Sequence, residues 1–328
     1  SGFEHVEMQF LSDVYLRCPD CDGRRYRPEL LEVKIVRGPR QLSVADVLDL
    51  TVSEASSLFK DDREVLARLQ PLVDVGLDYV RLGQPVPTLS GGEAQRLKLA
   101  GFLAEAATSS TQRLAKKGAL FLFDEPTTGL HFDDIAKLMR SLRKLLEAGH
   151  SIIVIEHNLD VIRACDWLID LGPEGGDAGG ELVAQGTPED LRAHPRSHTG
   201  AALREYDRAL GSAALVAEEG VPLQTLVVAR RAAQQQAADA IRIVNAREHN
   251  LKSLNVEIPR GRFNVVTGVS GSGKSTLAFD ILFNEGQRRY LESLNAYARS
   301  IVQPAGRPEV DAVWGIPPTV AIEQRLSR

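Results

Sequence analysis

The sequence Gly268-Val-Ser-Gly-Ser-Gly-Lys-Ser275 constrains the fold of this chain more than any other stretch. It has the pattern G-x-x-x-x-G-K-S, and it follows the apolar run 263–267 and precedes the helix-like run 276–282. A strand, a glycine-rich loop and a helix in this order bring backbone N–H groups and the positive end of a helix to one point. The sequence therefore predicts a phosphate-binding loop, which a chance glycine-rich turn would match only in the loop itself.

Within this loop we expect different side chains to have different roles. Lys274 should reach the β- and γ-phosphates of a nucleotide, and the hydroxyl of Ser275 should ligate Mg²⁺. The other residues that we expect to surround the phosphates are Gly268, Ser270, Gly271, Gly273 and Thr276.

Composition limits the class of protein. The 328 residues suffice for about two or three domains. Aromatic residues make up 5%, and the apolar residues are mainly Leu, Val, Ala and Ile, which favours buried parallel strands covered by helices. The net charge of −5 excludes a chain that is basic throughout, but residues 241–328 carry 12 Lys and Arg against 8 Asp and Glu. Any DNA contact would therefore use local basic patches. No apolar run approaches the length of a membrane span.

The three cysteines indicate a reducing, cytoplasmic compartment, because an odd and low count does not suit a disulfide scaffold. Cys18 and Cys21 form C-x-x-C, which is typical of a zinc knuckle, and His5 is the nearest further ligand candidate. A redox pair or two buried thiols are the alternatives. We expect Cys165 to be a core residue.

Residues 43–82 have helical spacing. Ser43 and Thr51 each precede an acidic residue three positions later, which is the spacing of a capping box. Apolar residues between 66 and 73 recur at helical intervals. We expect a helical layer with one apolar face.

A second phosphate-binding device is predicted at Thr88–Arg96. Its Leu-Ser-Gly-Gly precedes a long helix-like stretch. Ser90 and the N–H groups of Gly91 and Gly92 would lie at the N-terminus of that helix, where they can bind a γ-phosphate.

Two buried-strand runs end in residues suited to phosphate hydrolysis. The run 119–123 leads to Asp124, which we expect to hold Mg²⁺, and to Glu125, a candidate general base for an attacking water. The run 151–155 leads to His157, a candidate contact of the γ-phosphate. A third strand-like run ends at Gln324, a candidate Mg²⁺ ligand.

Together, these motifs make up the motif set of the ATP-binding-cassette ATPases, and their spelling resembles the UvrA family. UvrA is the damage-sensing ATPase subunit of the bacterial excision-repair nuclease. The resemblance covers nearly the whole chain except 205–240. The strings that carry it are Leu-Ser-Gly-Gly-Glu-Ala-Gln-Arg (89–96), Asp-Glu-Pro-Thr-Thr-Gly-Leu-His (124–131), Val-Ile-Glu-His-Asn-Leu-Asp (154–160), Ile-Asp-Leu-Gly-Pro-Glu-Gly-Gly (169–176), Ala-Arg-Glu-His-Asn-Leu-Lys (246–252) and Glu-Gly-Gln-Arg-Arg-Tyr (285–290).

The resemblance implies an α/β fold of the ATP-binding-cassette type, with a parallel-sheet core, helices and an antiparallel β subdomain. It implies ATP and Mg²⁺ as ligands, and Zn²⁺ in the complete protein. It implies lesion-containing double-stranded DNA, another cassette or a second UvrA subunit, and a UvrB-like protein as partners, with no membrane. The family's zinc module has four cysteines, of which this chain has the second pair only, so Cys18 and Cys21 are half a site.

The order of the motifs differs from that of a single cassette, because the phosphate loop and its Gln come last. We expect part of a zinc module at 1–35, the C-terminal half of a cassette at 36–204, a linker at 205–240 and the N-terminal half of a cassette at 241–328. The chain is then a window across the junction of two cassettes within a larger protein. Alternatively, the halves fold together as one permuted cassette. That alternative predicts that the strand before Gly268 lies beside the strand containing Phe121.

Two other functions remain possible at the level of sequence. One is the ATPase of a transport or drug-efflux system, against which the C-x-x-C and the Gly-Leu-His at 129–131 argue. The other is a fragment that contributes half-sites and has no activity of its own.

Overall fold

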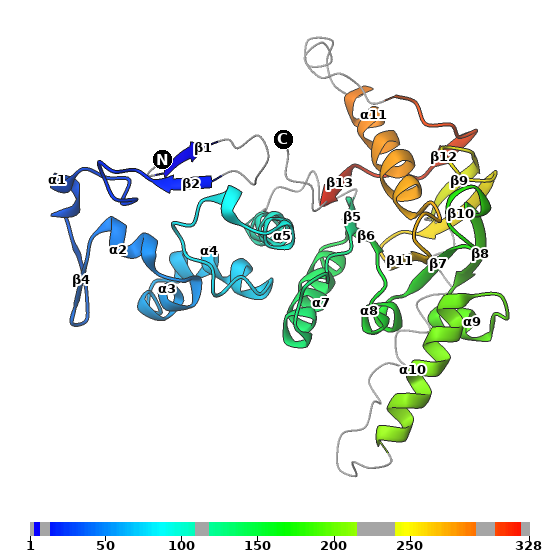
Figure 1. Cartoon of the computed structure of the whole chain (residues 1–328), viewed down its shortest axis with the longest axis horizontal. Coiled ribbons are helices and arrows are strands. Elements are labelled where there is room, and N and C mark those ends of the chain that lie inside the picture. Colours follow the sequence, from blue (N-terminus) through cyan, green and yellow to red (C-terminus); the bar gives the residue numbers. More distant parts are fainter. Residues whose placement is uncertain (1–2, 7–13, 109–117, 215–239, 293–305, 323–328) are drawn as a thin grey trace. The chain divides into compact units, whose positions relative to one another are not determined.

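The computed structural model describes residues 3–6, 14–108, 118–214, 240–292 and 306–322 (Figure 1). These residues form two compact units. The first contains the described residues up to 108 together with Gly129–Ser141, and the second contains 118–128 and the described residues from Leu142 to 322. Gln324 lies outside the described residues.

A six-stranded sheet forms the centre of the second unit. Its strand order is β13-β5-β6-β11-β7-β8, and all neighbours are parallel except β7 and β8. The strands are β5 (Leu120–Asp124), β6 (Ser151–Ile155), β7 (Trp167–Gly172), β8 (Glu181–Gly186), β11 (Phe263–Gly268) and β13 (Thr319–Ile322). Every residue of β6, and every residue of β5 before Asp124, is buried, as expected for parallel strands covered on both faces.

Strands from before and after residues 205–240 lie in this one sheet, with β11 and β13 from the later part and the other four from the earlier part. β11 pairs with β6 on one side and with β7 on the other. The expectation that the strand before Gly268 lies beside the strand containing Phe121 is wrong, because β6 pairs with both β5 and β11 and therefore separates them. The two halves nevertheless share one sheet, in which the phosphate-loop strand is inserted between two strands of the preceding half.

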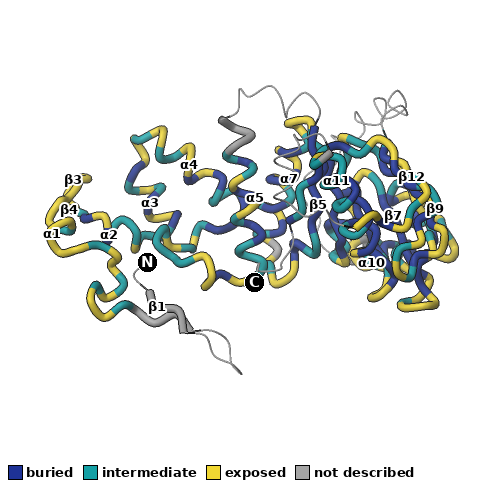
Figure 2. Tube along the Cα trace, turned by 90° about the horizontal axis from the view of Figure 1, so that it is seen from above, coloured by how far each residue is buried: buried dark blue, intermediate teal, exposed yellow. Residues whose placement is uncertain are grey.

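A three-stranded antiparallel sheet, in the order β10-β9-β12, also belongs to the second unit. It comprises β9 (Ala240–Ala246), β10 (Leu254–Pro259) and β12 (Ala312–Trp314). Alternate side chains of β10 are buried, and Ile243 and Val256 share a core cluster with residues of the parallel sheet such as Leu122 and Ile169. The α/β fold with an antiparallel subdomain is thus confirmed. Figure 2 shows buried residues concentrated in this second unit, along β5 and β7.

Helices cover both faces of the parallel sheet. α10 packs on β11 and α9 packs on β7, while η5, which has π-helical hydrogen bonding, packs on β5 and β13. In Figure 1 the label of α11 and those of α8 to α10 lie on opposite sides of the strands. The helical elements of this unit are α8 (Leu159–Ala164), η2 (Gly176–Ala178), α9 (Pro188–Ala193), α10 (His198–Ala214), η5 (Thr276–Phe283) and α11 (Asn284–Glu292). Residues 205–214, expected to begin a linker, form the end of α10.

The first unit is mainly helical. Both predicted capping boxes are present, from Ser43 to Asp46 and from Thr51 to Glu54. Its elements are β1 (Phe3–Val6), β2 (Val14–Arg17), α1 (Pro28–Leu31), β3 (Ile35–Arg37), β4 (Arg40–Leu42), α2 (Val44–Asp49), α3 (Val52–Leu58), α4 (Arg63–Asp74), η1 (Val86–Thr88) and α5 (Gly91–Thr108). Residues of α7 (Phe132–Glu147) are divided between the two units.

The predicted apolar face of these helices is also confirmed. Val52, Ala55, Phe59 and Leu69 form a buried cluster. None of the helices in the described part of the chain is long and apolar enough to cross a membrane.

His150 ties β5 to β6 and makes this contact sensitive to pH. Its Nδ1 accepts a hydrogen bond from the backbone N–H of Ala119 at 3.1 Å, and its ring meets that of Phe121 edge-on, with centroids 5.2 Å apart. Burial lowers the pKa of His150 below its usual 6.5. The folded state therefore needs the neutral imidazole, and its stability falls as the pH drops below the pKa of the unfolded chain.

We predict that His150→Asn reduces this loss of stability, because an Asn oxygen can accept the same bond without titrating. The free energy of unfolding should be measured in urea from about pH 7.5 to about pH 5.5. The wild type should lose more stability than the variant over this range. The same substitution at His131, which is exposed, serves as the control. An equal loss in wild type and His150→Asn would contradict the prediction.

Candidate nucleotide-binding site

The predicted phosphate loop has the expected context. It leaves the carboxyl end of β11 and enters η5 at Thr276. The backbone of Gly268 has a φ of +137°, and a Cβ at this position would lie 2.1 Å from the carbonyl oxygen of Leu171. Only glycine fits this close approach between the loop and β7.

Lys274 is held inside the loop. It is 7% exposed, and its Nζ donates to the carbonyl oxygens of Gly268 and Val269, both at 2.9 Å. Burial lowers the pKa of Lys274, and the nearby charges of Glu125, Asp124 and Asp170 oppose that shift. The ammonium group is thus placed for phosphate within the electrostatic reach of three carboxylates.

The ends of β5 and β6 bring two predicted site residues together. Glu125 has a φ of +44°, and its N–H donates to Ile155 at 3.0 Å. The Nε2 atom of His157 lies 3.3 Å from Oε1 of Glu125. Asp124 is paired with Ile155 in the sheet register. Left-handed backbone at a non-glycine residue is costly and persists where surrounding structure enforces it, which is common at functional sites.

Glu156, for which the sequence suggested no role, organises the loops around these residues. It is 2% exposed. Its carboxylate accepts hydrogen bonds from N and Oγ1 of Thr127, at 3.0 and 2.6 Å, and from the backbone N–H groups of His157 and Asn158, at 2.9 and 3.1 Å. A buried carboxylate with this many donors fixes the segment after Glu125 and the segment carrying His157 to one another.

Asp170 is a second buried carboxylate that the sequence reading missed. It is 3% exposed and accepts hydrogen bonds from the hydroxyls of Ser197, Thr199 and Thr267, at 2.6, 2.9 and 2.9 Å. Thr267 directly precedes the phosphate loop, so Asp170 ties the base of the loop to β7 and α10. The available signal was a lone acid within the otherwise apolar run 167–172.

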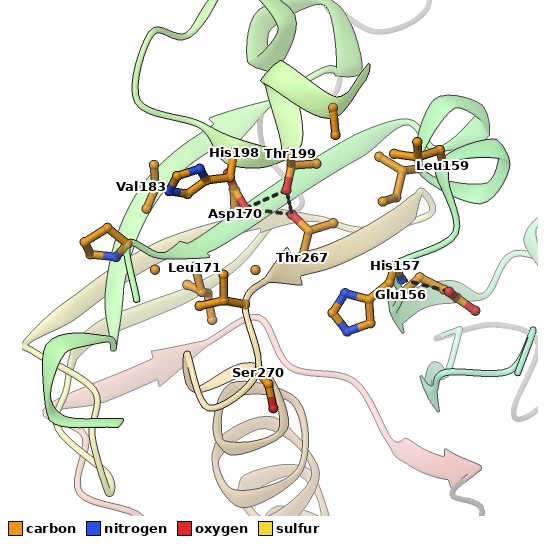
Figure 3. A pocket seen from close by; sticks show the side chains of 16 residues that line it. Glu156, His157, Leu159, Asp170, Leu171, Val183, His198, Thr199, Thr267 and Ser270 are labelled. Atoms are coloured by element: carbon orange, nitrogen blue, oxygen red, sulfur yellow. Dashed lines mark hydrogen bonds between the residues drawn. The ribbon is translucent and has the colours of Figure 1, made fainter. Parts of the chain in front are cut away.

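A cavity of about 380 Å³ lies beside the phosphate loop (Figure 3). His157 and Ser270 line it from different elements, and the hydrogen-bonded group of Asp170, Thr199 and Thr267 forms another part of its wall. Lys274 is not part of its lining. The cavity therefore borders the phosphate loop at Gly268, Val269 and Ser270.

Comparison with known proteins decides which family has this site. No protein-family model matches the chain. UvrABC system protein A of Thermus thermophilus is 55% identical over 202 residues, which are 62% of this chain and 20% of that protein. The same protein of Chlamydia muridarum is 38% identical over 314 residues, 95% of this chain and 16% of that protein. The chain belongs to the UvrA family.

The match to the Chlamydia protein has a further consequence. Because it covers 95% of the chain, this match includes both the stretch before residues 205–240 and the stretch after them. The crystal structure of UvrA2 from Deinococcus radiodurans resembles this structure with a TM-score of 0.54 and 45% identity, covering 62% of this chain and 24% of that one. The chain spans about a fifth of the length of the curated relatives. UvrA is an ATPase family of the ATP-binding-cassette type, and these relatives do not favour the transport alternative.

The UvrA signature sequence lies in the first unit, at the start of α5. Ser90 caps this helix, because its Oγ accepts from the N–H of Glu93 at 3.3 Å while Oε2 of Glu93 accepts from the N–H of Ser90 at 2.7 Å. Burial raises the pKa of Glu93, but hydrogen bonds from Tyr79 and Ser90 outweigh it and lower the pKa overall. Gly91 and Gly92 form the first turn, where backbone N–H groups have no partner within the helix.

The cysteines of the C-x-x-C do not complete a metal site. Cys18 and Cys21 are free and partly buried, and a backbone hydrogen bond from Arg25 lowers the pKa of Cys21. Within the described ranges, no group of three or more His, Cys, Asp or Glu could hold a metal ion. Two thiols are half of a tetrahedral zinc site. Cys165 is buried, and its thiol donates to Ile162 at 3.1 Å, as a core residue would.

We predict that Glu156→Gln destabilises the second unit more than Asp170→Asn does. Three of the donors to Glu156 are backbone N–H groups, which cannot act as acceptors. The NH₂ group of the introduced Gln would therefore point at an N–H donor, and a hydrogen bond would be lost. All three direct donors to Asp170 are hydroxyls, which can rotate to accept instead. We expect Glu156→Gln to cost about 2 kcal/mol in urea unfolding, and Asp170→Asn clearly less. Equal losses would contradict this explanation.

Proposed function

We propose that this chain binds ATP with Mg²⁺ and hydrolyses it. The observation that carries the proposal is that the phosphate loop, Asp124, Glu125 and His157 all follow the carboxyl ends of strands in one parallel sheet. That edge is where α/β sheets of this kind bind their ligands. The charges of Asp124 and Glu125 also interact favourably with the buried ammonium group of Lys274.

The residues have distinct proposed roles. The backbone of Gly268–Thr276 surrounds the phosphates, and Lys274 leaves its two loop carbonyls to bind the β- and γ-phosphates. Ser275 and Asp124, with Gln324, would hold Mg²⁺, which neutralises charge on the phosphates when bound. Glu125 accepts a proton from the attacking water. His157, 3.3 Å from Glu125, orients that carboxylate and contacts the γ-phosphate.

We assign Ser90, Gly91 and Gly92 to ATP bound by another cassette or by a second UvrA subunit. The support is the position of Ser90, Gly91 and Gly92 at the N-terminus of α5, where the first backbone N–H groups of a helix can bind an anion. Under this proposal the protein works as a dimer of cassettes.

In the complete protein we propose the UvrA role, recognition of damaged double-stranded DNA in nucleotide excision repair in the cytoplasm, with a UvrB-like partner and a zinc module. Family membership and sequence identity support this role. We further propose that 36–204 supplies the C-terminal half and 241–328 the N-terminal half of a cassette, joined by a linker within 205–240, and that 1–35 is the partial zinc module.

Two substitutions test the ATPase proposal. Lys274→Ala should abolish ATP binding, because it removes the buried cation of the loop. Glu125→Gln should keep ATP binding and lower the turnover rate by about 100-fold or more, because it removes the base. Nucleotide binding by calorimetry and steady-state phosphate release measure the two effects.

Glu257→Gln, which alters an exposed acid paired with Arg242 on the antiparallel sheet, is the matched control and should change neither quantity. Full turnover in a clean Glu125→Gln sample would disprove the base assignment. A wild-type chain that binds no ATP would favour a fragment with half-sites only.

DNA binding tests the repair proposal. The affinity of the chain for a lesion-containing duplex and for a plain duplex should be compared between about 50 and about 200 mM salt. Both affinities should fall with salt, because the release of counterions from the DNA on binding becomes less favourable as the salt concentration rises. The ratio in favour of the lesion should persist, since it does not depend on phosphate contacts alone. Equal affinities at every salt concentration would exclude lesion recognition by this stretch of UvrA.

A further inference from the structure

The phosphate loop is held from outside by a side chain to which neither the motifs nor the proposed chemistry assigns a role. Asn250 lies in the connection between β9 and β10. Its Nδ2 donates to the carbonyl oxygen of Gly271 at 2.7 Å and to that of Gly176 at 3.0 Å. Both hydrogens of the amide are therefore used, one on the phosphate loop and one on the loop after β7.

The loop after β7 contacts the phosphate loop directly as well. The N–H of Gly176 donates to the carbonyl of Gly271 at 3.0 Å, so this carbonyl accepts two hydrogen bonds. Gly175 packs so closely that a Cβ there would lie 2.2 Å from the carbonyl oxygen of Ser270. The backbone φ of Gly175 is −97°, which other residues also adopt, so this close approach alone requires glycine.

A third contact closes the arrangement. The N–H of Lys252 donates to the carbonyl of Gly180 at 2.9 Å, and a Cβ on Gly180 would lie 1.8 Å from the carbonyl oxygen of Asn250. Residues 175–180 therefore contact residues 250–252 through both the side chain and the backbone of Asn250. We refer to these contacts, together with the hydrogen bond from Asn250 to Gly271, as the brace.

We propose that Asn250 is a positioning residue that orients the phosphate loop for binding the β-phosphate. A peptide group has its C=O and N–H on opposite sides, so fixing the Gly271 carbonyl outward turns the N–H of Ser272 inward. That N–H now donates to Val269 at 3.2 Å, inside the loop, where phosphate would compete for it. The proposal rests on the proposed function, since it concerns the same nucleotide site.

The brace also gives a structural role to two of the sequence strings that resemble the UvrA family. Asn250 belongs to the string 246–252 and Gly176 to the string 169–176, and both touch the carbonyl of Gly271. An orientation that is set before binding reduces the ordering cost of taking up a nucleotide. Losing it therefore weakens affinity and leaves the chemical step unchanged.

The test uses Asn250→Asp and Asn250→Ala, with Asn255→Asp as the matched control. Asn255 lies in β10, where its Oδ1 accepts a hydrogen bond from the N–H of Asn245 and its Nδ2 donates to the carbonyl of Ser253. Neither partner belongs to the phosphate loop. Both Asn250 variants should weaken ATP and ADP binding by roughly tenfold, raise KM and leave kcat unchanged, with Asp the more severe because its charge faces two carbonyls. Asn255→Asp should resemble the wild type.

The pH dependence of nucleotide affinity distinguishes this proposal from a merely structural role, which would not change with pH. Protonated Asp can donate one hydrogen bond, so the affinity of Asn250→Asp relative to Asn255→Asp should recover as the pH is lowered toward about 5. The affinity of Asn250→Ala relative to that of Asn255→Asp should stay constant over the same pH range. Loss of kcat at unchanged affinity, or an equal loss in Asn255→Asp, would overturn the proposal.

Hydrogen exchange of the loop amides, measured without nucleotide, separates this proposal from the proposed function. Exchange in a peptide covering 268–276 should be faster in both Asn250 variants, and also in Gly175→Ala, which forces the two loops apart while leaving Asn250 in place. Gly101→Ala, where a Cβ meets no atom within 4 Å, is the control for the latter. Unchanged exchange would overturn the proposal that Asn250 positions the loop. Faster exchange in a chain that binds no ATP would support that positioning and refute the proposed ATPase function.

Discussion

The insertion of β11 between β6 and β7 is the contact on which the rest of this structure depends. Parallel pairing on both sides buries every residue of β11 from Phe263 to Thr267 and places Gly268 beside Leu171. Because parallel strands end at the same edge, the insertion brings the phosphate loop to the edge where β5 and β6 present Glu125 and His157. Without it, residues before and after 205–240 would carry complementary motifs with no common site.

Two buried carboxylates keep this edge in register. Glu156 joins the segment after Glu125 to the segment bearing His157, and Asp170 joins the base of the phosphate loop to α10. Both are saturated with hydrogen-bond donors, which is the condition under which a buried charge is tolerated. The residues proposed for chemistry, in contrast, are left partly exposed: the side chain of Glu125 is 45% exposed and that of His157 is 51% exposed. Buried, hydrogen-bonded carboxylates therefore hold the segments that carry the exposed side chains proposed for chemistry.

Much of the site could be predicted because its chemistry is local. The strand, glycine-rich loop and helix of the phosphate loop all lie within residues 263–283, and the capping boxes run from Ser43 to Asp46 and from Thr51 to Glu54. Contacts across the sheet could not be predicted in the same way. The alternative of one permuted cassette predicted that the strand before Gly268 lies beside β5, yet β6 separates them, because pairing partners depend on how all the strands pack. The sequence showed no role for Asp170 or Asn250, because the partners of Asp170 lie 27 to 97 positions away and those of Asn250 lie 21 to 74 positions away.

By itself, the sequence determined the α/β class, the strand–loop–helix context of Gly268–Ser275, the helix after Leu89-Ser-Gly-Gly92 and the resemblance to UvrA, because each follows from residues close together in the chain. Only the tertiary structure decided that one sheet takes strands from both sides of residues 205–240, in the order β13-β5-β6-β11-β7-β8. It also decided which carboxylates are buried supports and which carbonyl of the phosphate loop is braced by Asn250. The physical reason is that strand pairing, burial and hydrogen bonding of buried polar groups depend on segments that are distant in the sequence. These segments come together only when the sheet packs and excludes water.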